Sequence, residues 1–294
     1  MRKGHWEKNL VELIRRTSTD LPADVEAALR RAFKREKKSS LAAWALETIL
    51  QNAARARRES VPLCQDTGEM TFYFRVPVEF DTNALAAHTR TAVSKATRLG
   101  YLRQNTLDSV SGASFETNVA HGAPTFCFEQ GARKTVDVRL VLKGGGCENV
   151  GRQYSLPDMT IRAERDLEGV RRCVLDAVWR AQGAGCAPGI VGVCIGGSRA
   201  SSYAHSKEQF LRRVGERSRV RTLALLEKKL MRDLNRLEIG SMGLGGKTTV
   251  LGVKIGALSR VPACYFVTVS YMCWALRRRG VVLGPEGGVH RWLY

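Results

Sequence analysis

The chain has 294 residues, of which 44% are hydrophobic and 26% charged, so it can bury a substantial core as one large domain or two smaller ones. No apolar run reaches the roughly 20 residues that a membrane-spanning helix needs. The charged amino-terminal segment Met1–Glu7 is not followed by the apolar stretch of a secretory signal. These features argue against a membrane protein and predict a cytoplasmic location.

The formal net charge of +19 favours an anionic partner, such as nucleic acid, an acidic subunit or a small polyanion. The basic residues stand in short scattered runs, for example Lys37-Lys38 and Arg277–Arg279. Aromatic residues are not interleaved with these runs, as a nucleic-acid stacking surface requires. We therefore expect solvated helical surfaces or a face for an acidic partner, rather than a nucleic-acid site.

Helical periodicity covers residues 7–58, where apolar residues recur every three or four positions. The helical periodicity is absent from residues 61–80, where a polar turn precedes a predicted strand at 70–76. A further helix is predicted over 83–99.

In the rest of the chain, residues 136–142 alternate and predict a half-buried strand that ends in a glycine-rich loop. The pattern then predicts helices over 160–182, 200–214 and 219–238, and strands over 190–195, 249–255 and 264–270. Interleaved strands and helices predict an α/β fold with mixed β-sheets flanked by helices. With no repeat or linker, we expect a single domain over 1–294, including a helical extension at 1–40 and a tail at 280–294.

The eight cysteines include no Cys-x-x-Cys pair, which argues against a zinc ribbon or a thioredoxin-like motif. In a cytoplasmic chain they are reduced, so each is a core residue, a reactive thiol or a metal ligand. Their spacing does not choose among these roles.

Three glycine-containing segments beside predicted strands could bring backbone N–H groups to a ligand. Cys64–Gly68 places a thiol, an amide and a carboxylate in consecutive positions. It could bind a metal through sulfur while Asp66 transfers a proton, or it could be an ordinary turn. Segments 143–149 and 185–199 could bind a small anion, and neither they nor 240–248 match a P-loop. The residues themselves indicate a small anionic ligand and leave the metal open.

Four segments in order resemble the family of class I fumarate hydratases and L-tartrate dehydratase α subunits: 62–68, 143–151, 186–197 and 269–275. The resemblance covers about residues 40–280. It implies the amino-terminal-domain fold of class I fumarases. It also implies a hydro-lyase that eliminates water from a hydroxy-dicarboxylic acid, converting L-tartrate to oxaloacetate or interconverting malate and fumarate.

The resemblance further implies a [4Fe-4S] cluster held by Cys64, Cys186 and Cys273. Three thiolates leave one iron without a protein ligand, and that iron can act as a Lewis acid toward the substrate. The other five cysteines are then expected to be structural, with Cys147 in the glycine loop the weakest case.

The same comparison assigns Asp66 to proton transfer and Gln65, Arg103 and Gly145 to substrate binding. A guanidinium fork suits a substrate carboxylate, whereas without the resemblance Arg103 reads as a surface arginine. A small dicarboxylate is the implied substrate.

Two positions depart from the family: Val261 stands where a histidine is expected, and Ser198 where an aspartate is expected. With the positive charge, they motivate an alternative, a catalytically diverged basic interaction protein that binds nucleic acid or an acidic partner. The short stretch after Cys273 holds no counterpart of the family's C-terminal domain. We therefore expect a separate β subunit to carry the rest of the active site.

Overall fold

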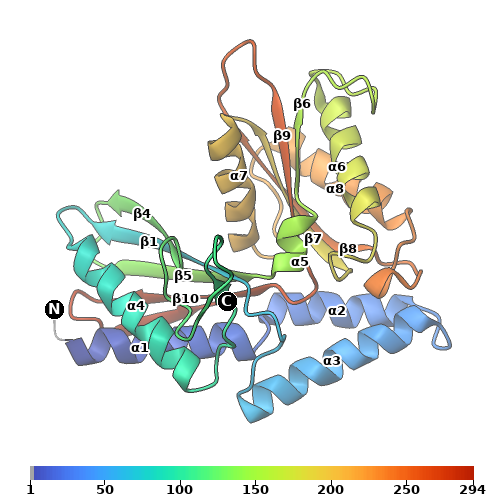
Figure 1. The fold of residues 1–294 in the computed structure, drawn as a ribbon. Coiled ribbons are helices and arrows are strands. Elements are labelled where there is room, and N and C mark those ends of the chain that lie inside the picture. Colours follow the sequence, from blue (N-terminus) through green and yellow to red (C-terminus); the bar gives the residue numbers. More distant parts are fainter. Residues whose placement is uncertain (1–2) are drawn as a thin grey trace. The chain divides into compact units, whose positions relative to one another are not determined.

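The structure is a computed structural model that describes residues 3–294; Met1 and Arg2, part of the amino-terminal segment considered above, lie outside the described residues. The chain forms two compact units, each with its own main sheet (Figure 1). Unit 1 takes residues up to 22, 51–145 and 277–294, and unit 2 takes 23–50 and 146–276. The expectation of a single domain over 1–294 stays a prediction.

Unit 1 is built on a five-stranded sheet in the order β11-β10-β5-β1-β4. Only β1 and β4 are parallel; the other neighbours are antiparallel. The strands are β1 Glu69–Pro77, β4 Thr125–Gly131, β5 Val136–Lys143, β10 Arg277–Leu283 and β11 Val289–Leu293, and the helices are α1 Lys3–Thr19 and α4 Thr82–Arg98. The two-stranded pair β2 Thr106–Leu107 and β3 Ser114–Phe115 lies beyond α4 in the sequence.

The core of unit 1 forms because helical and strand periodicities place apolar side chains on facing surfaces. Leu10, Leu13 and Ile14 on α1 are fully buried with Phe72 and Phe74 of β1. Burying such side chains contributes about 1.5–3 kcal/mol each. β5, predicted to be half-buried, is instead buried along nearly its whole length because it pairs with β1 on one side and β10 on the other.

Unit 2 is built on a four-stranded sheet in the order β6-β9-β7-β8, with β7 and β8 parallel. The strands are β6 Arg152–Ser155, β7 Gly189–Gly196, β8 Val250–Leu258 and β9 Phe266–Met272. The helices are α2 Ala23–Arg35, α5 Gly145–Asn149, α6 Leu167–Ala181, α7 Arg199–Glu208 and α8 Arg221–Asn235, with short 3-10 turns at Gln209–Leu211 and Ser241–Gly243. Helix α3, Leu41–Glu59, starts in unit 2 and ends in unit 1, and the first residue of α5, Gly145, belongs to unit 1.

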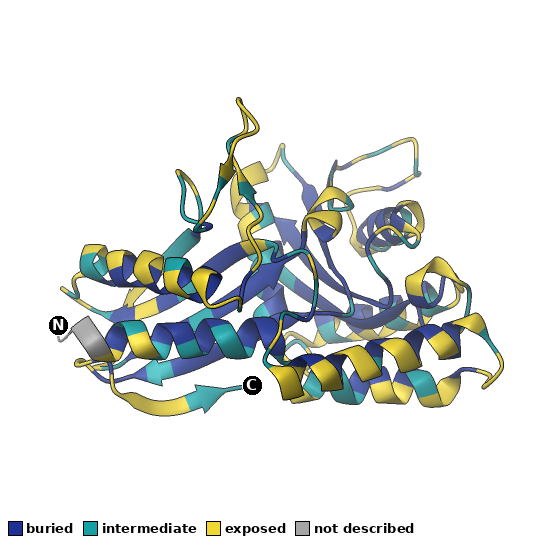
Figure 2. Cartoon of the chain, turned by 60° about the horizontal axis from the view of Figure 1, so that its bottom comes forward, coloured by how far each residue is buried: buried dark blue, intermediate teal, exposed yellow. Residues whose placement is uncertain are grey.

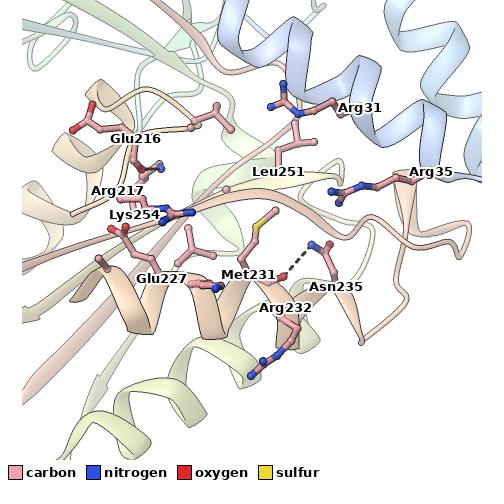
Figure 3. Close-up of a pocket in the computed structure, with 16 residues that line it drawn as sticks. Arg31, Arg35, Glu216, Arg217, Glu227, Met231, Arg232, Asn235, Leu251 and Lys254 are labelled. Carbon is pink, nitrogen blue, oxygen red and sulfur yellow. Dashed lines mark hydrogen bonds between the residues drawn. The ribbon is translucent and has the colours of Figure 1, made fainter. Parts of the chain in front are cut away.

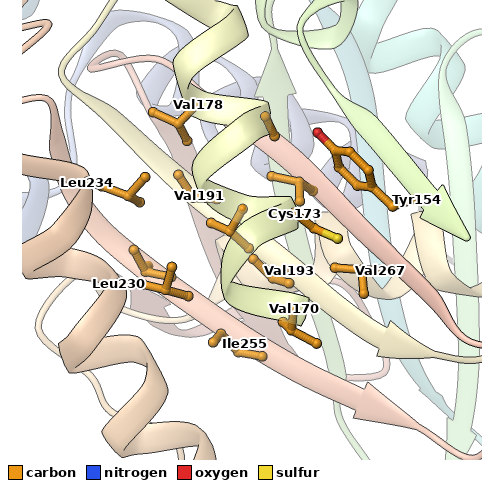
Figure 4. Packing of buried hydrophobic residues seen from close by; sticks show 14 of the residues in the cluster. Tyr154, Val170, Cys173, Val178, Val191, Val193, Leu230, Leu234, Ile255 and Val267 are labelled. Carbon is orange, nitrogen blue, oxygen red and sulfur yellow. The ribbon is translucent and has the colours of Figure 1, made fainter. Parts of the chain in front are cut away.

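The two faces of the unit 2 sheet carry different side chains. Figure 4 shows valines of the sheet, such as Val193 and Val267, packed with Cys173 of α6 and Leu230 of α8. Helix α7 bonds through hydroxyls instead: Ser206 Oγ and Ser270 Oγ lie 2.7 Å apart. Successive side chains of a strand point to opposite faces, so Ser270 of β9 lies on the face opposite to Val267. Helix α7, which bonds to Ser270, therefore covers the face away from the valines. The predicted mixed α/β fold is confirmed.

Three helices of unit 2 have boundaries that differ from the sequence prediction. The helix expected over 160–182 begins at Leu167, because the Asp166 carboxylate caps it by accepting a 2.7 Å hydrogen bond from Gly169 N. Helix α7 stops at Glu208 rather than 214, and α8 covers 221–235 rather than 219–238. The boundaries moved because capping and turn geometry, rather than periodicity, end a helix.

The carboxyl-terminal segment 280–294, expected as a tail, includes most of β10 and all of β11. The run Arg277–Arg279, expected on a solvated helical surface, lies in β10 and is buried. Arg279 pairs with Asp20 at 2.6 Å, and the Arg278 guanidinium stacks 4.6 Å from the Tyr294 ring. Pairing with Asp20 and stacking on Tyr294 make this burial possible, since an isolated buried charge is costly.

Figure 2 shows the resulting segregation: strands are mostly buried, whereas the helices carry exposed residues along one side. In the part of the chain that the structure describes, no helix is both long and apolar enough to span a bilayer.

Candidate active site

The loop that contains Cys64 and Asp66 connects α3 to β1 in unit 1. Cys64 is half-buried, and its Sγ accepts a hydrogen bond from the backbone N–H of Asp66 at 3.4 Å. A hydrogen bond of this kind orients the sulfur, as the partners around a metal-ligating side chain do.

The Asp66 carboxylate is held at both oxygens. Oδ2 accepts from the backbone N–H of Gly145 at 2.7 Å, and Oδ1 accepts from Asn105 Nδ2 at 2.9 Å. The Asp66 backbone oxygen accepts from Arg277 Nη1 at 2.8 Å. Two segments of unit 1 therefore orient the side chain and a third holds its backbone, which gives the fixed position that proton transfer requires.

Glycine is needed where the two loops of unit 1 touch. A Cβ on Gly68, which has φ +80°, would lie 2.5 Å from the Lys143 carbonyl carbon. A Cβ on Gly144 would lie 2.9 Å from Asp66 Oδ2. The glycines that marked both loops in the sequence thus permit a close backbone approach.

The segment that carries Arg103 is fixed beside this loop by its backbone. Thr67 Oγ1 donates to Arg103 O and accepts from Arg103 N, both at 2.8 Å. Asn118, which is fully buried, donates to Arg103 O and accepts from Asn105 N, also at 2.8 Å. Positioning of Asn105 therefore depends on Asn118.

A cavity of about 310 Å³ in unit 1 is lined by twelve residues. They include Asp66, Asn105, Gly145 and the segment 122–125. A cavity of this size suits a small ligand. The structure thus brings Asp66 and Gly145 together at one cavity.

Gln65 and Arg103 do not line that cavity. Both are exposed, and the Arg103 guanidinium makes no hydrogen bond within residues 3–294. Three residues of the site were missed by sequence reasoning. Asn105 stands two positions after Arg103, Asn118 carries no motif, and Arg277 was placed in a solvated run.

In unit 2, Cys186 and Cys273 belong to one small cluster with Cys147, Trp274 and Ala275. Trp274 N donates to Cys186 O at 3.3 Å, and Cys147 Sγ lies 3.7 Å from Gly185 O. The fold therefore collects thiols from three distant segments of this unit. The sequence had left Cys147 as a structural residue, and here it is a neighbour of two proposed ligands.

A tyrosine fills the space between the two glycines that flank Cys186. A Cβ on Gly185 would lie 2.5 Å from the Tyr271 ring, and one on Gly189 would lie 2.3 Å from it. The Tyr271 hydroxyl is buried and has no hydrogen-bond partner among the described residues. Burial raises the pKa of Tyr271, with smaller contributions from the thiols of the cluster, so the phenol stays protonated.

The chemical types of these residues fit an iron–sulfur cluster that is bound by thiolates. Cys186 and Cys273 lie in one cluster beside a buried, unsatisfied hydroxyl, and Cys64 carries a hydrogen bond to its sulfur. Over residues 3–294, no three His, Cys, Asp or Glu side chains already converge at metal-binding distance. Cys64 lies in unit 1 and the other two in unit 2. The ligand set stays a prediction.

Two other cysteines, Cys173 and Cys194, are buried core residues. Cys173 is fully buried in the core of unit 2, and burial raises its pKa to about 12. Cys194 lies in the interior of β7, where burial also raises its pKa. Protonated thiols of this kind act as small apolar side chains.

The two departures from the family pattern occupy ordinary structural positions. Ser198 caps α7 and exchanges hydrogen bonds with Ser201. Val261 lies in the loop before β9 and is 62% exposed.

The profile of the fumarate hydratase (Fumerase) family matches residues 7–282. The chain belongs to this family. The match extends beyond the 40–280 range of the resemblance and confirms it.

Three relatives show the range of the similarity. The chain is 45% identical over 291 residues to "Putative fumarate hydratase class I" of Geobacillus stearothermophilus, covering 98% of this chain but 57% of that protein. It is 33% identical to "Putative L(+)-tartrate dehydratase subunit alpha" of Methanocaldococcus jannaschii, covering 92% and 94% of the two chains. It is 32% identical to "L(+)-tartrate dehydratase subunit alpha" of Escherichia coli K12, covering 90% and 86%. The alternative of a non-catalytic basic interaction protein finds no support in these matches.

Proposed function

We propose that this chain is the iron–sulfur part of a hydro-lyase that eliminates water from a hydroxy-dicarboxylic acid. Family membership supports the reaction class, and the names of the relatives supply the candidate substrates: fumarate or malate, and L-tartrate. The observation that carries the proposal is the Asp66 carboxylate, held by Gly145 N and Asn105 at one cavity, two residues from Cys64.

The proposed cluster ligands are Cys64, Cys186 and Cys273, as the family resemblance implies. A [4Fe-4S] cluster bound to them would supply an iron without a protein ligand, a Lewis acid for the leaving hydroxyl. The thiol cluster of unit 2 and the hydrogen-bonded sulfur of Cys64 support this assignment.

Elimination removes a proton from the carbon next to the one that bears the hydroxyl, forms the carbon–carbon double bond and releases water. Asp66 is proposed to transfer a proton at its carboxylate, whose position depends on Gly145 and Asn105. Gln65 and Arg103 are proposed to bind the substrate's carboxylates from the exposed rim of the same loop region. The backbone N–H of Gly145 would bind substrate only if substrate displaces Asp66 Oδ2 from it.

The partner is proposed to be a β subunit that carries the remaining substrate contacts. The support is that two relatives of similar length are named as subunit alpha, whereas the chain matches 57% of the longer class I fumarate hydratase. A cytoplasmic location belongs to the same proposal, because an iron–sulfur hydro-lyase with reduced thiols suits a reducing compartment.

The decisive experiment is anaerobic purification and cluster reconstitution, followed by co-expression with the candidate β subunit and assays of tartrate, malate and fumarate. The expected protein is brown, contains iron and absorbs broadly near ~400 nm. Cys186→Ser and Cys273→Ser should each lose iron, whereas Cys264→Ser, which changes a half-buried cysteine of the same unit, should keep it. An iron-free protein after reconstitution, or inactivity on all three acids, would refute the proposal.

A further inference from the structure

A basic groove in unit 2 has no role in the proposed reaction. Its volume is about 480 Å³, and its walls come from α2, the loop 214–217, α8 and β8. Figure 3 shows Arg31 and Arg35 extending from α2 on one side and Met231 and Arg232 on α8 on the other. A hollow of this volume lies in the range of small-molecule sites.

Cations outnumber carboxylates among the groove's lining residues. The cationic side chains are Arg31, Arg35, Arg217, Lys228, Arg232 and Lys254, and the carboxylates are Glu216 and Glu227. Arg212 pairs with both carboxylates, at 3.4 Å from Glu216 and 2.8 Å from Glu227. Glu227 also accepts from the backbone N–H of Ile255 at 2.8 Å, so little negative charge is left for the groove.

The side chains of four of the groove's cations, Arg31, Arg35, Arg217 and Lys228, form no ion pair or hydrogen bond with any described residue. A second basic pocket, in unit 1, differs in this respect. There Asp20 pairs with Arg57 and Arg279, and Glu12 pairs with Arg15 and Arg16.

The spacing of these cations places like charges close together on α2 and on α8. Arg31 and Arg35 are four residues apart on α2, and Lys228 and Arg232 are four residues apart on α8. Like charges at this spacing lie on one helix face and destabilise the helix. An anion bound in the groove would remove that repulsion.

The groove also has apolar lining: Val214, Ala224, Met231, Leu251 and Val253. Guanidinium forks recognise phosphate through paired hydrogen bonds, and an apolar surface suits a flat ring system. We propose that this groove binds a nucleoside polyphosphate, with its phosphates on Arg31, Arg35 and Lys228 and its base on the apolar residues. The site is independent of the proposed dehydratase activity.

The test is calorimetric titration of the full chain with ATP and, separately, with inorganic tripolyphosphate at low and at physiological salt. Both are expected to bind, with affinity falling as salt rises. ATP is expected to bind more tightly, because only ATP can use the apolar residues.

The variant Arg31→Gln/Arg35→Gln/Lys228→Gln is expected to bind ATP at least ten-fold more weakly. The matched control Lys37→Gln/Lys38→Gln/Arg219→Gln removes the same charge from exposed residues outside the groove and should bind as the wild type does. Without ligand, the groove variant should melt no lower than the wild type, because its like-charge pairs are gone. Should that variant not fold, the comparison of ATP with tripolyphosphate on the wild type still decides the question.

Three results with the phosphate probes would overturn the inference. They are no binding of either probe at low salt, equal weakening by the groove and control variants, and tripolyphosphate binding as tightly as ATP. Binding of mixed-sequence duplex DNA without binding of ATP would also overturn it, because the groove would then be part of a nucleic-acid surface.

Discussion

The Asp66 carboxylate accepts a 2.7 Å hydrogen bond from the backbone N–H of Gly145, and this contact joins the cysteine loop to the glycine loop of unit 1. Two segments that the sequence marked separately are therefore one chemical site. Asn105 completes it by donating to the other carboxylate oxygen.

Asp66→Asn should abolish most dehydratase activity while leaving the fold intact. The amide oxygen can still accept from Gly145 N, but an amide does not transfer the proton, and loss of such a group typically costs ~10²–10⁴-fold in rate. The measurement is the turnover of the reconstituted enzyme with circular dichroism as the check on folding. Glu129→Gln, an exposed carboxylate of β4, is the matched control, and similar activity in both variants would contradict the assignment.

Gly144→Ala should reduce activity without much loss of stability. Its Cβ would fall 2.9 Å from Asp66 Oδ2, so the carboxylate must move, and a side-chain end moves more easily than backbone. Gly146→Ala is the control two positions away, because its Cβ would meet nothing closer than Ala184 O at 3.6 Å. If the two variants were equally active, the crowding argument would be wrong.

Asn118→Ala should destabilise the protein by about 2–3 kcal/mol, because a buried amide that bonds to Arg103, Asn105 and Thr97 is lost. Asn118 also has φ +58°, a left-handed conformation that costs a non-glycine residue about 1–2 kcal/mol. Asn118→Gly should therefore lose less stability than Asn118→Ala. Urea unfolding of the two variants measures the difference, and the reverse order would reject the strain argument.

Raising the pH should lower stability through Cys173. In the unfolded chain its thiol loses its proton near pH ~8.5, whereas burial raises its folded pKa to about 12. The folded state thus keeps a proton that the unfolded state releases, so the contribution is complete below the unfolded pKa and is lost as pH rises toward the folded one. The expected slope is about 1.4 kcal/mol per pH unit.

Urea unfolding at pH 8 and pH 10 checks the Cys173 prediction. Cys173→Ala should show a shallower decline in the free energy of unfolding than the wild type. Cys264→Ala, at a half-buried position, should decline as the wild type does. An unchanged slope in Cys173→Ala would show that this thiol is not responsible.

Much of the fold could be predicted from residue patterns because neighbours in sequence decide local structure. The strand predicted at 70–76 is β1, the strand at 190–195 is β7, and the helix at 83–99 is α4, each within a residue or so. The glycine loops were also predictable, since a glycine run next to a polar residue shows where backbone can approach closely. Those signals led to Cys64, Asp66 and Gly145.

The sequence by itself therefore determined the family, the mixed α/β class and the loops that carry the chemistry. Only the tertiary structure decided that Asn105 and Asn118 support Asp66, that Arg277–Arg279 is a buried strand, and that 289–293 extends the sheet. The reason is physical. From the sequence alone a basic run is predicted to be solvated, because its partners, such as Asp20 and Asp66, are distant in the sequence and reach it only in the folded chain. Local periodicity records what a residue's neighbours require, whereas burial of a charge depends on contacts that the folded chain alone supplies.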